Sequence, residues 1–317
     1  MSAQERMIRM YDRALVSNDY RHYYEDSGFY NFGYWNTRAK SQREASEALV
    51  DQLIEKIPYR SGRILDVACG PGASTKRLTR SYPSDQITAI NISESQLAAA
   101  RKRAPGCAFL LMDATQLGFP EAQFDAVMCV EAAFHFDTRD TFLREAWRVL
   151  KPGGSLVLTD MLFRGFLRPF GKYGQVPPAN FLPDIASYRA GLEAAGFEGV
   201  NVKDATQACL GGFRRHLARW PASERRSGGM KLGKSIAASL LSGMIAQYFG
   251  TVCKTYLIAA ARKPIVPSSS ILLRKPRPPM RSVDNIVPTQ YDTAVNADLL
   301  QGDSGIGLAE EKPSLRE

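Results

Sequence analysis

A short apolar run that breaks into a glycine-containing turn constrains this chain more than any other feature. Residues 64–68 read ILDVA, and residues 69–72 read CGPG. The pattern predicts a buried strand that delivers the chain to a tight turn, where glycines without Cβ atoms let a ligand lie against the backbone. A helix that starts near Ala73 would point its free N–H groups at that ligand.

Strands and helices alternate on the carboxyl side of this turn. Further strands are predicted at 86–92, 108–112, 124–130, 155–159, 197–202 and 253–260, and helices at 74–82, 94–103, 141–150, 184–195 and 235–248. The sequence KPGG at 151–154 is a stop signal for the third of these helices. Nearly all-apolar strands are typical of a parallel sheet that is covered on both faces, and the alternation implies right-handed βαβ crossovers. We therefore expect an α/β fold with a doubly wound sheet.

Composition divides the chain into three regions. Residues 1–58 are rich in tyrosine and indicate helix, loop and helix, the last of them amphipathic over 41–56. Residues 59–264 hold the alternating elements. Residues 265–317 contain SSS, PRPP and a polar acidic end, a composition that predicts disorder.

Several protein classes are excluded by what the sequence lacks. The longest apolar segment, 236–249, is interrupted by polar residues and falls short of the roughly 20 residues of a membrane span. The N-terminus has no apolar core of a secretory signal. Five cysteines without a C-x-x-C and three histidines without an H-x-x-x-H indicate neither disulfides nor a metal site. We expect a reduced, cytoplasmic protein.

The residues around the glycines narrow the class of ligand. The sequence has no G-K-[ST], which argues against a nucleoside triphosphate. Thr75 stands where a dinucleotide-binding G-x-G-x-x-G would have its third glycine. Asp66 would repel a pyrophosphate, whereas its carboxylate suits an ammonium group. A nicotinamide-dependent oxidoreductase is therefore disfavoured.

Residues 64–163 resemble the class I S-adenosylmethionine-dependent methyltransferases, and most of all their small-molecule and natural-product branch, which includes sugar O-methyltransferases. NFGYW at 31–35, LKPGG at 150–154 and YLIAAARKP at 256–264 support that branch. The resemblance implies a seven-stranded Rossmann-like sheet whose last strand, near Tyr256, inserts antiparallel. It also implies S-adenosyl-L-methionine as cofactor, without a metal, and makes residues 59–264 the donor-binding domain with substrate-covering insertions.

The resemblance also assigns residues to the methionine end of the donor. Asp66 and Gly70 would hold the methionine part, with Gly72 packing nearby. Glu131, at the end of the fourth strand, would lie near the same end and could equally be structural.

At the adenosine end, Asp113 matches the acid that accepts a hydrogen bond from the adenine amino group. Ala114 and Gln116 would line the ring together with Leu117. The family often has an acid for the ribose hydroxyls at the end of the second strand, where this chain has Asn91. An amide can still bond two hydroxyls, but without a charge. Alternatively, Asn91 is a turn residue that caps the next helix.

His135 and Asp160 are the candidate catalytic residues. Methyl transfer from a sulfonium is an in-line displacement, so the protein aligns the acceptor and removes its proton. His135 follows the fourth strand at the ligand edge, and histidine's ordinary pKa of about 6.5 suits a general base. In the resembled enzymes a histidine here acts with an acid after the fifth strand, the position of Asp160. The alternatives are a packed histidine and an aspartate that caps a loop.

Tyr30, Tyr34 and Trp35 could form an aromatic lid over donor and acceptor, so residues 1–58 would be a lid segment. Alternatively, these rings pack the N-terminal helices on the sheet.

A basic insertion follows the sixth predicted strand. Such a charge run is usually a solvated face, but it could also recognise an anionic acceptor, a carrier protein or a lipid headgroup. Nucleic-acid binding is disfavoured because no recognised motif accompanies the charge. The insertion holds Arg214, Arg215, Arg219, Arg225, Arg226, Lys231 and Lys234.

The sequence thus predicts a methyltransferase that acts on a small-molecule, hydrophobic or glycosylated acceptor, at a hydroxyl. Alternatives are C- or N-methylation of a prenyl, sterol-like or amine acceptor, and a non-catalytic donor-binding module that assembles with a partner. The acceptor's identity and the oligomeric state stay open.

Overall fold

The sheet has seven strands in the order β3-β2-β1-β4-β5-β7-β6. The pairs from β3 to β5 are parallel, whereas β7 runs antiparallel to both of its neighbours. The predicted α/β fold, with an antiparallel last strand in a mostly parallel sheet, is confirmed. The strands are β1 Ile64–Val67, β2 Ile87–Asn91, β3 Ala108–Leu111, β4 Phe124–Val130, β5 Leu150–Phe163, β6 Glu198–Asp204 and β7 Cys253–Arg262.

The structure is a computed structural model that describes residues 2–35, 38–170 and 176–265, all within one compact unit. The prediction of disorder for residues 265–317 lies outside the described residues, except for Ile265.

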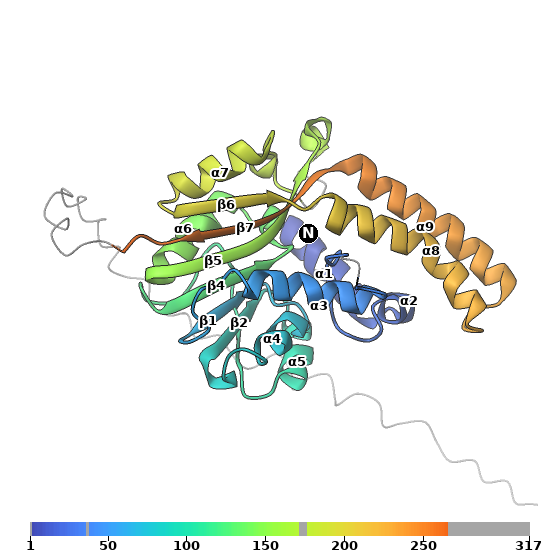
Figure 1. Ribbon diagram of the computed structural model, residues 1–317, viewed down its shortest axis with the longest axis horizontal. Coiled ribbons are helices and arrows are strands. Elements are labelled where there is room, and N and C mark those ends of the chain that lie inside the picture. The colour runs from blue at the N-terminus through green and yellow to red at the C-terminus, as the bar shows by residue number, and fades with distance from the viewer. Residues whose placement is uncertain (1, 36–37, 171–175, 266–317) are drawn as a thin grey trace, which may run out of the picture. The chain divides into compact units, whose positions relative to one another are not determined.

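Helices cover both faces of the sheet (Figure 1). On one face lie α3 (Gln42–Ile54), α4 (Ala73–Leu78) and α5 (Glu94–Arg103), and on the other α6 (Arg139–Val149) and α7 (Ile185–Ala194). A polar side chain accepts an amide hydrogen bond at the start of four of them, which fixes where each begins. These caps are Ser41 for α3, Ser93 for α5, Thr138 for α6 and Asp184 for α7.

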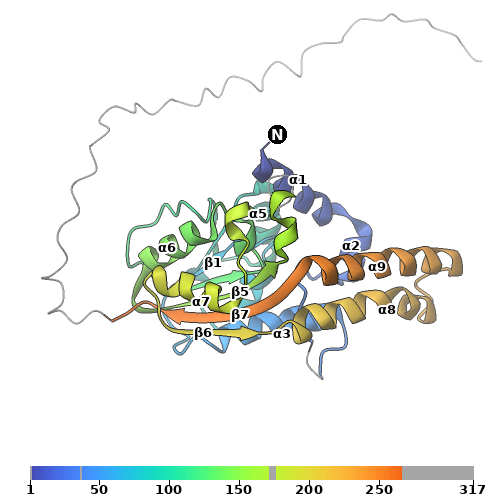
Figure 2. The ribbon, with the colours of Figure 1, turned by 90° about the horizontal axis from the view of Figure 1, so that it is seen from above.

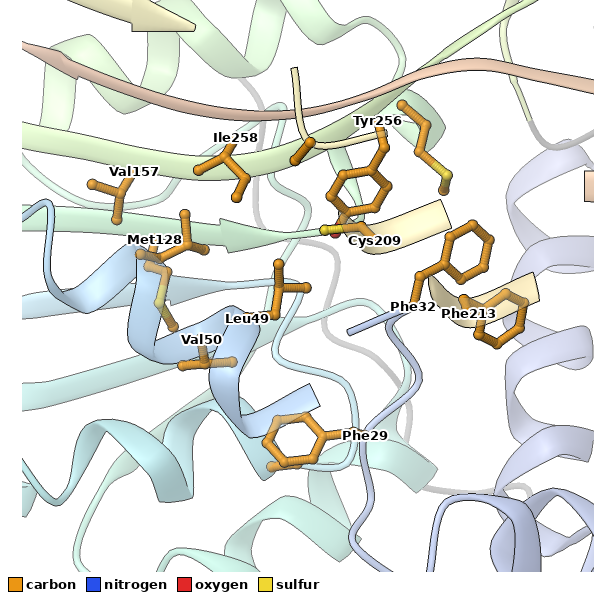
Figure 3. Packing of buried hydrophobic residues seen from close by; sticks show 14 of the residues in the cluster. Phe29, Phe32, Leu49, Val50, Met128, Val157, Cys209, Phe213, Tyr256 and Ile258 are labelled. Carbon is orange, nitrogen blue, oxygen red and sulfur yellow. The ribbon is translucent and has the colours of Figure 1, made fainter. Parts of the chain in front are cut away.

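One core cluster lies between α3 and the sheet (Figure 3). Leu49 and Val50 of α3 belong to the same buried cluster as Met128 of β4, Val157 of β5 and Ile258 of β7. Because successive side chains of a strand point to opposite faces, the neighbouring residues of β4 and β5 pack against α6 and α7. Both faces of the central strands are therefore buried.

The strand register brings the carboxyl ends of the parallel strands to one edge. Val67 of β1 pairs with Ile90 of β2 on one side and with Cys129 of β4 on the other. Asn91 and Val130 follow these partners directly, so the chain leaves three central strands side by side. Open α/β sheets bind ligands at this edge.

The segment 151–154 ends α6 and also begins the fifth strand. The predicted helix 141–150 stops at Val149, and β5 starts at Leu150, ahead of the predicted 155. The amide of Gly153 donates to the carbonyl oxygen of Lys263 at 2.9 Å. The stop signal is therefore also part of the sheet.

Two further helices precede α3 in the chain. In α1 (Ala3–Val16), Ser2 and Glu5 cap each other's backbone amides, a capping box. The short α2 (Asn18–Tyr23) follows at once, with Ser17 as its cap.

A helical hairpin leaves the sheet after β6 and returns to it at β7 (Figures 1 and 2). Its two arms are α8 (Gly212–Arg226) and α9 (Leu232–Val252). The second arm is longer than the predicted helix 235–248. Contrary to the expectation from its sequence, this 21-residue helix is long and apolar enough to cross a membrane by length and composition alone.

Candidate active site

Asp66 lies in β1 beneath the glycine turn and is fully buried. The hydroxyl groups of Ser74 and Thr75 donate to its Oδ2 at 2.8 and 2.7 Å. Its Oδ1 is buried and has no hydrogen-bond partner among the described residues. Desolvation raises the pKa of Asp66 to about 6, although both hydroxyls act in the opposite direction. The free oxygen is therefore poised for a cationic donor group that the protein does not supply.

The two glycines of the turn have different surroundings. A Cβ on Gly70 would meet only the side-chain oxygen of Gln96, at 3.8 Å, so the space above this backbone is open. A Cβ on Gly72 would lie 2.7 Å from the Cα of Ala100 in α5. Both glycines have positive φ, 56° and 85°. Gly70 therefore leaves room for a ligand, whereas Gly72 lets α5 pack against the turn.

Asn91 closes the turn after β2. Its Oδ1 accepts from the amides of Ile92 and Ser93, and its Nδ2 donates to Gln96. The hydroxyl of Ser93 donates to Asp12 of α1 at 2.7 Å. A carboxylate from the N-terminal helix thus lies beside the residue predicted to meet the ribose.

Asp113 follows β3 by two residues and is half-buried. Its Oδ1 accepts from the amide and hydroxyl of Thr115, and its Oδ2 accepts from Gln4 of α1 at 2.9 Å. Next to it Ala114 is buried, whereas Gln116 is exposed. An adenine amino group that bonds Oδ2 would therefore lie beside Gln4 or displace it.

His135 lies in the short turn η2 (Ala133–His135) that follows β4. Its Nε2 is 2.9 Å from the hydroxyl oxygen of Tyr11 in α1, and its ring lies 4.0 Å from that of Phe134. Burial, with help from Tyr20 and Glu131, raises the pKa of Tyr11, so this phenol keeps its proton. It can donate to Nε2 when Nδ1 carries the imidazole proton.

Asp160 is fully buried near the end of β5 and belongs to an ion pair. Its Oδ2 accepts from Arg139 at 2.7 Å and from Tyr188 at 3.0 Å, and its Oδ1 accepts from the amide of Met161. Arg139 also bonds the carbonyl oxygen of Asn180. Both oxygens of the carboxylate predicted to orient His135 are thus engaged by other partners.

Asn180 links this ion pair to the turn of His135. Its Nδ2 donates to the carbonyl oxygens of Phe134 and Phe136, at 3.0 and 2.7 Å. The connection that the structure shows from Asp160 to His135 therefore runs through Arg139 and Asn180, and it fixes the backbone on both sides of the histidine.

Glu131 ends β4 beside the N-terminal segment. Its Oε1 accepts from the amide of Phe32 at 2.7 Å and from the hydroxyl of Tyr256 at 2.6 Å. Desolvation raises its pKa to about 8. Phe32 in turn stacks on Phe213 of α8, with ring centroids 4.4 Å apart (Figure 3). Glu131 therefore joins the sheet edge to residues 29–35.

The three predicted lid residues lie in different surroundings. Tyr30 stacks with Tyr11, at a centroid distance of 6.4 Å, and so lies near His135. The backbone amide of Tyr34 donates to Ala45 of α3. The ring of Trp35 packs 4.4 Å from His216 of α8, and its Nε1 donates to the carbonyl oxygen of Phe32. Tyr30 is thus linked to the predicted catalytic group through Tyr11, whose ring lies 5.7 Å from that of His135.

Sequence reasoning missed the part played by α1. Gln4, Tyr11 and Asp12 contact Asp113, His135 and Ser93, three positions on the sheet edge. Residues seven or eight apart share one face of a helix, so Gln4 with Tyr11 and Asp12 form a polar stripe that the sequence contains. Nothing in the sequence says that this stripe faces the sheet.

The arrangement at this edge can hold a cation-bearing ligand with a flat ring at one end. The buried Oδ1 of Asp66 lies on β1, and the open backbone of Gly70 lies in the turn after it. Asp113 follows β3, which is separated from β1 by β2. His135 lies beside β1, after β4. A ligand that spans β1 to β3 would therefore have the imidazole next to its end at Asp66.

Comparisons with known proteins identify relatives of this chain. Residues 65–158 match the family model described as a methyltransferase domain. The chain is 34% identical over 192 residues to 27-O-demethylrifamycin SV methyltransferase of Amycolatopsis mediterranei, a match that covers 55% of this chain and 68% of that enzyme. It is 40% identical over 137 residues to 2-methyl-6-phytyl-1,4-hydroquinone methyltransferase of Synechocystis, covering 42% and 43% of the two chains.

Among solved structures, the crystal structure of the [4+2]-cyclase SpnF is similar to the structure of this chain. The two chains share 28% sequence identity and superpose with a TM-score of 0.62, over 84% of this chain and 97% of that one.

Proposed function

The chain belongs to the class I S-adenosylmethionine-dependent methyltransferases, and we propose that it methylates a hydroxyl group with His135 as the general base. Transfer from S-adenosylmethionine to a natural-product type of acceptor follows from the family. We propose further that the methylated atom is a hydroxyl oxygen and that His135 removes its proton. We also propose that residues 1–58 form a lid segment and residues 59–264 the donor-binding domain.

The residues at the sheet edge fit the donor. Its ammonium group matches the buried Oδ1 of Asp66, which has no partner among the described residues, and its chain can lie over Gly70, where a Cβ would meet open space. When bound, the donor supplies a methyl group on a positively charged sulfur. Asp113 would hold the adenine amino group, and Asp12 beside Ser93 would supply the charge that Asn91 lacks.

One observation carries the choice of a hydroxyl acceptor. The Nε2 atom of His135 already bonds a hydroxyl group, that of Tyr11, at 2.9 Å. An acceptor hydroxyl that takes this place would have an imidazole nitrogen at the distance a general base needs. His135 would take the proton, while Asn180 and the aromatic ring of Phe134 keep its turn in place.

The acceptor is proposed to be hydrophobic or to carry a hydrophobic core. Phe134, Phe163 and Phe181 form a chain of rings beside His135, with successive centroids 5.3 and 6.4 Å apart. By its name, the relative from Amycolatopsis mediterranei acts on 27-O-demethylrifamycin SV, and we take an acceptor of this kind as the model.

Methyl transfer from labelled donor to a panel of polyketide and glycosylated acceptors tests the proposal, with the methylated atom assigned by NMR. Replacing His135 by Ala should lower turnover by about 100- to 10,000-fold while the affinity for S-adenosylhomocysteine is unchanged. His22→Ala is the matched control, because this histidine lies exposed on α2. Normal turnover of a hydroxyl acceptor by His135→Ala would disprove the base assignment.

A second candidate is carbon methylation of a prenylated ring. The same aromatic wall would suit a prenyl chain, and the phytyl-hydroquinone relative acts on such a compound by its name. In that case the NMR assignment would place the label on carbon, and a hydroxyl-blocked acceptor would still be methylated.

A further inference from the structure

Most large apolar side chains of α9 are exposed, although Phe249 near its end packs against Phe32 and Phe213. Small residues of this helix, such as Ser235, Ser242 and Ala246, are buried, whereas Leu240 and Met244 are 68% and 70% exposed. Contiguous apolar surface of this kind marks an interaction site. We call it the apolar face of α9; it consists of Leu232, Ile236, Leu240, Leu241, Met244, Ile245 and Tyr248.

Arginines of α8 lie beside this face. A groove of about 630 Å³ between the two helices is lined by Arg225 and Arg226 on one side and by Ile236 and Leu240 on the other. A second groove, of about 480 Å³, is lined by further residues of both helices, including Arg214, Arg215 and Arg219. Neither groove is lined by a residue assigned to the donor or the catalytic edge.

The charge of the hairpin is strongly one-sided. Residues 207–252 hold seven lysines and arginines and a single acid, Glu224, which lies 2.7 Å from His22. A second copy that docked through the same face would bring its own arginines against these, because a twofold interface uses one patch twice. The occupant of this face is therefore expected to be both apolar and anionic.

The way the hairpin is connected decides how it could meet a bilayer. α8 follows β6, and α9 leads directly into β7, so both ends of the hairpin are attached to the sheet (Figure 2). If α9 crossed the bilayer, its partner α8 would have to cross too, with Arg219, Arg225 and Arg226 in hydrocarbon, which is costly. Shallow insertion leaves the arginines at the headgroups.

We propose that the α8–α9 hairpin docks this enzyme on the surface of an anionic phospholipid bilayer. The apolar face of α9 lies at the boundary of headgroups and acyl chains, and the arginines of α8 bind phosphate groups. The inference does not rest on the function proposed for the sheet edge, since it uses neither His135 nor the donor site.

Co-sedimentation of the full chain with vesicles tests the docking. At low salt the protein should sediment with vesicles that contain phosphatidylglycerol, and much less with pure phosphatidylcholine. The double variant Leu240→Ser with Met244→Ser should bind at least about tenfold more weakly, because it removes apolar contact. Tyr59→Ser with Leu111→Ser, two residues that are 79% and 60% exposed elsewhere, is the control and should bind like the native chain.

A charge variant tests the anionic part. Arg219→Ser, Arg225→Ser and Arg226→Ser together should reduce binding to the anionic vesicles, and high salt should do the same. The control changes the same number of exposed cations elsewhere, at Lys102 on α5, Arg144 on α6 and Arg80 in the turn after α4.

Three results would overturn the proposal. The first is equal loss of vesicle binding in the hairpin variants and their controls. The second is equal binding to neutral and anionic vesicles. The third is a native chain that does not bind vesicles but instead forms a complex with itself or with an acidic carrier protein, and loses that complex in Leu240→Ser with Met244→Ser. Analytical ultracentrifugation detects either complex.

Discussion

The hydroxyl oxygen of Tyr11 lies 2.9 Å from Nε2 of His135, although 124 residues separate the two in the chain. The N-terminal helix therefore reaches the same imidazole that the sheet edge presents to an acceptor. Any acceptor that approaches His135 must share this space with Tyr11 or displace it.

Replacing Tyr11 by Phe removes this hydrogen bond and keeps the ring. If Tyr11 only orients the imidazole, turnover should fall by up to about tenfold, the value of one ordinary hydrogen bond, with unchanged donor affinity. Steady-state kinetics measure this, with Tyr59→Phe as the exposed control. A loss as large as that of His135→Ala would instead place the phenol on the path of the proton.

Asp12 should contribute to donor affinity. Its carboxylate accepts from Ser93 beside the turn of Asn91, where the ribose hydroxyls are proposed to lie. Asp12→Asn should weaken S-adenosylhomocysteine binding by about tenfold or more, because hydrogen bonds to a charged group are the stronger kind. Calorimetry measures it. Asp19→Asn, on exposed α2, should change nothing; equal effects of the two would mean that Asp12 acts only through net charge.

Donor affinity should depend on pH through Asp66. The ammonium group of the donor is held best by the ionised carboxylate, and burial raises the pKa of Asp66 to about 6. Binding should therefore weaken as the pH falls through about 6, well above the ordinary range of an aspartate. Constant affinity between pH 7.5 and pH 5 would show that Asp66 does not meet the ammonium group.

The same carboxyl should impose an opposite dependence on stability. Its pKa is higher in the folded chain than in the unfolded one, so the folded state holds the extra proton, and this contribution is lost as the pH rises from about 4 through about 6. The contribution of Asp66 to this fall in the free energy of unfolding should be about 3 kcal/mol. The difference between the native chain and Asp66→Asn, measured by unfolding in urea at each pH, should show it, because Glu131, whose pKa is also raised, is the same in both.

The two glycines of the turn should respond differently to alanine. Gly72→Ala forces a Cβ to 2.7 Å from the backbone of Ala100, so unfolding in urea should show a loss of about 2–4 kcal/mol. Gly70→Ala should cost only about 1 kcal/mol, for its positive φ. It should nevertheless lose most of its donor affinity. If Gly70→Ala binds the donor with native affinity, Gly70 does not contact the donor.

Asp160 is expected to be a positioning residue. Asp160→Asn leaves the buried Arg139 without its counter-charge and should destabilise the fold by about 3–5 kcal/mol. Adding Arg139→Met should restore much of that stability, whereas Asn180 would still hold the turn of His135. If Asp160→Asn instead abolishes turnover at native stability, Asp160 acts directly on His135 or the acceptor.

The sequence predicted the central sheet well because its signals are local. The apolar run that forms β4 and the glycine turn after β1 each lie within a few residues. Both end at the ligand-binding edge of the sheet, as the topology of parallel strands requires. The contact of Tyr11 with His135 could not be predicted, since it depends on how α1 is placed. For Asp160 the sequence did contain a signal that its side chain faces α6 and α7. Residues two apart in a strand point to the same face of the sheet, and Leu158 packs toward these helices.

The length of α9 was underestimated for a related reason. Ser239, Ser242 and Gly243 look like interruptions of an apolar run when the residues are read in order. On the helix, Ser242 is buried and Ser239 and Gly243 are half-buried, which leaves the large side chains outward. A sequence records the polarity of each residue but not the direction in which its neighbours lie.

The place of β7 between β5 and β6 has a consequence for synthesis on the ribosome. β6 pairs with β7 in the sheet, and β7 is the last strand of the described chain. While α8, of 15 residues, and α9, of 21 residues, are being translated, β5 has an open edge and β6 has no strand to pair with. Open strand edges recruit other strands, so the interval before residue 253 emerges is when a nascent chain most needs protection from its neighbours.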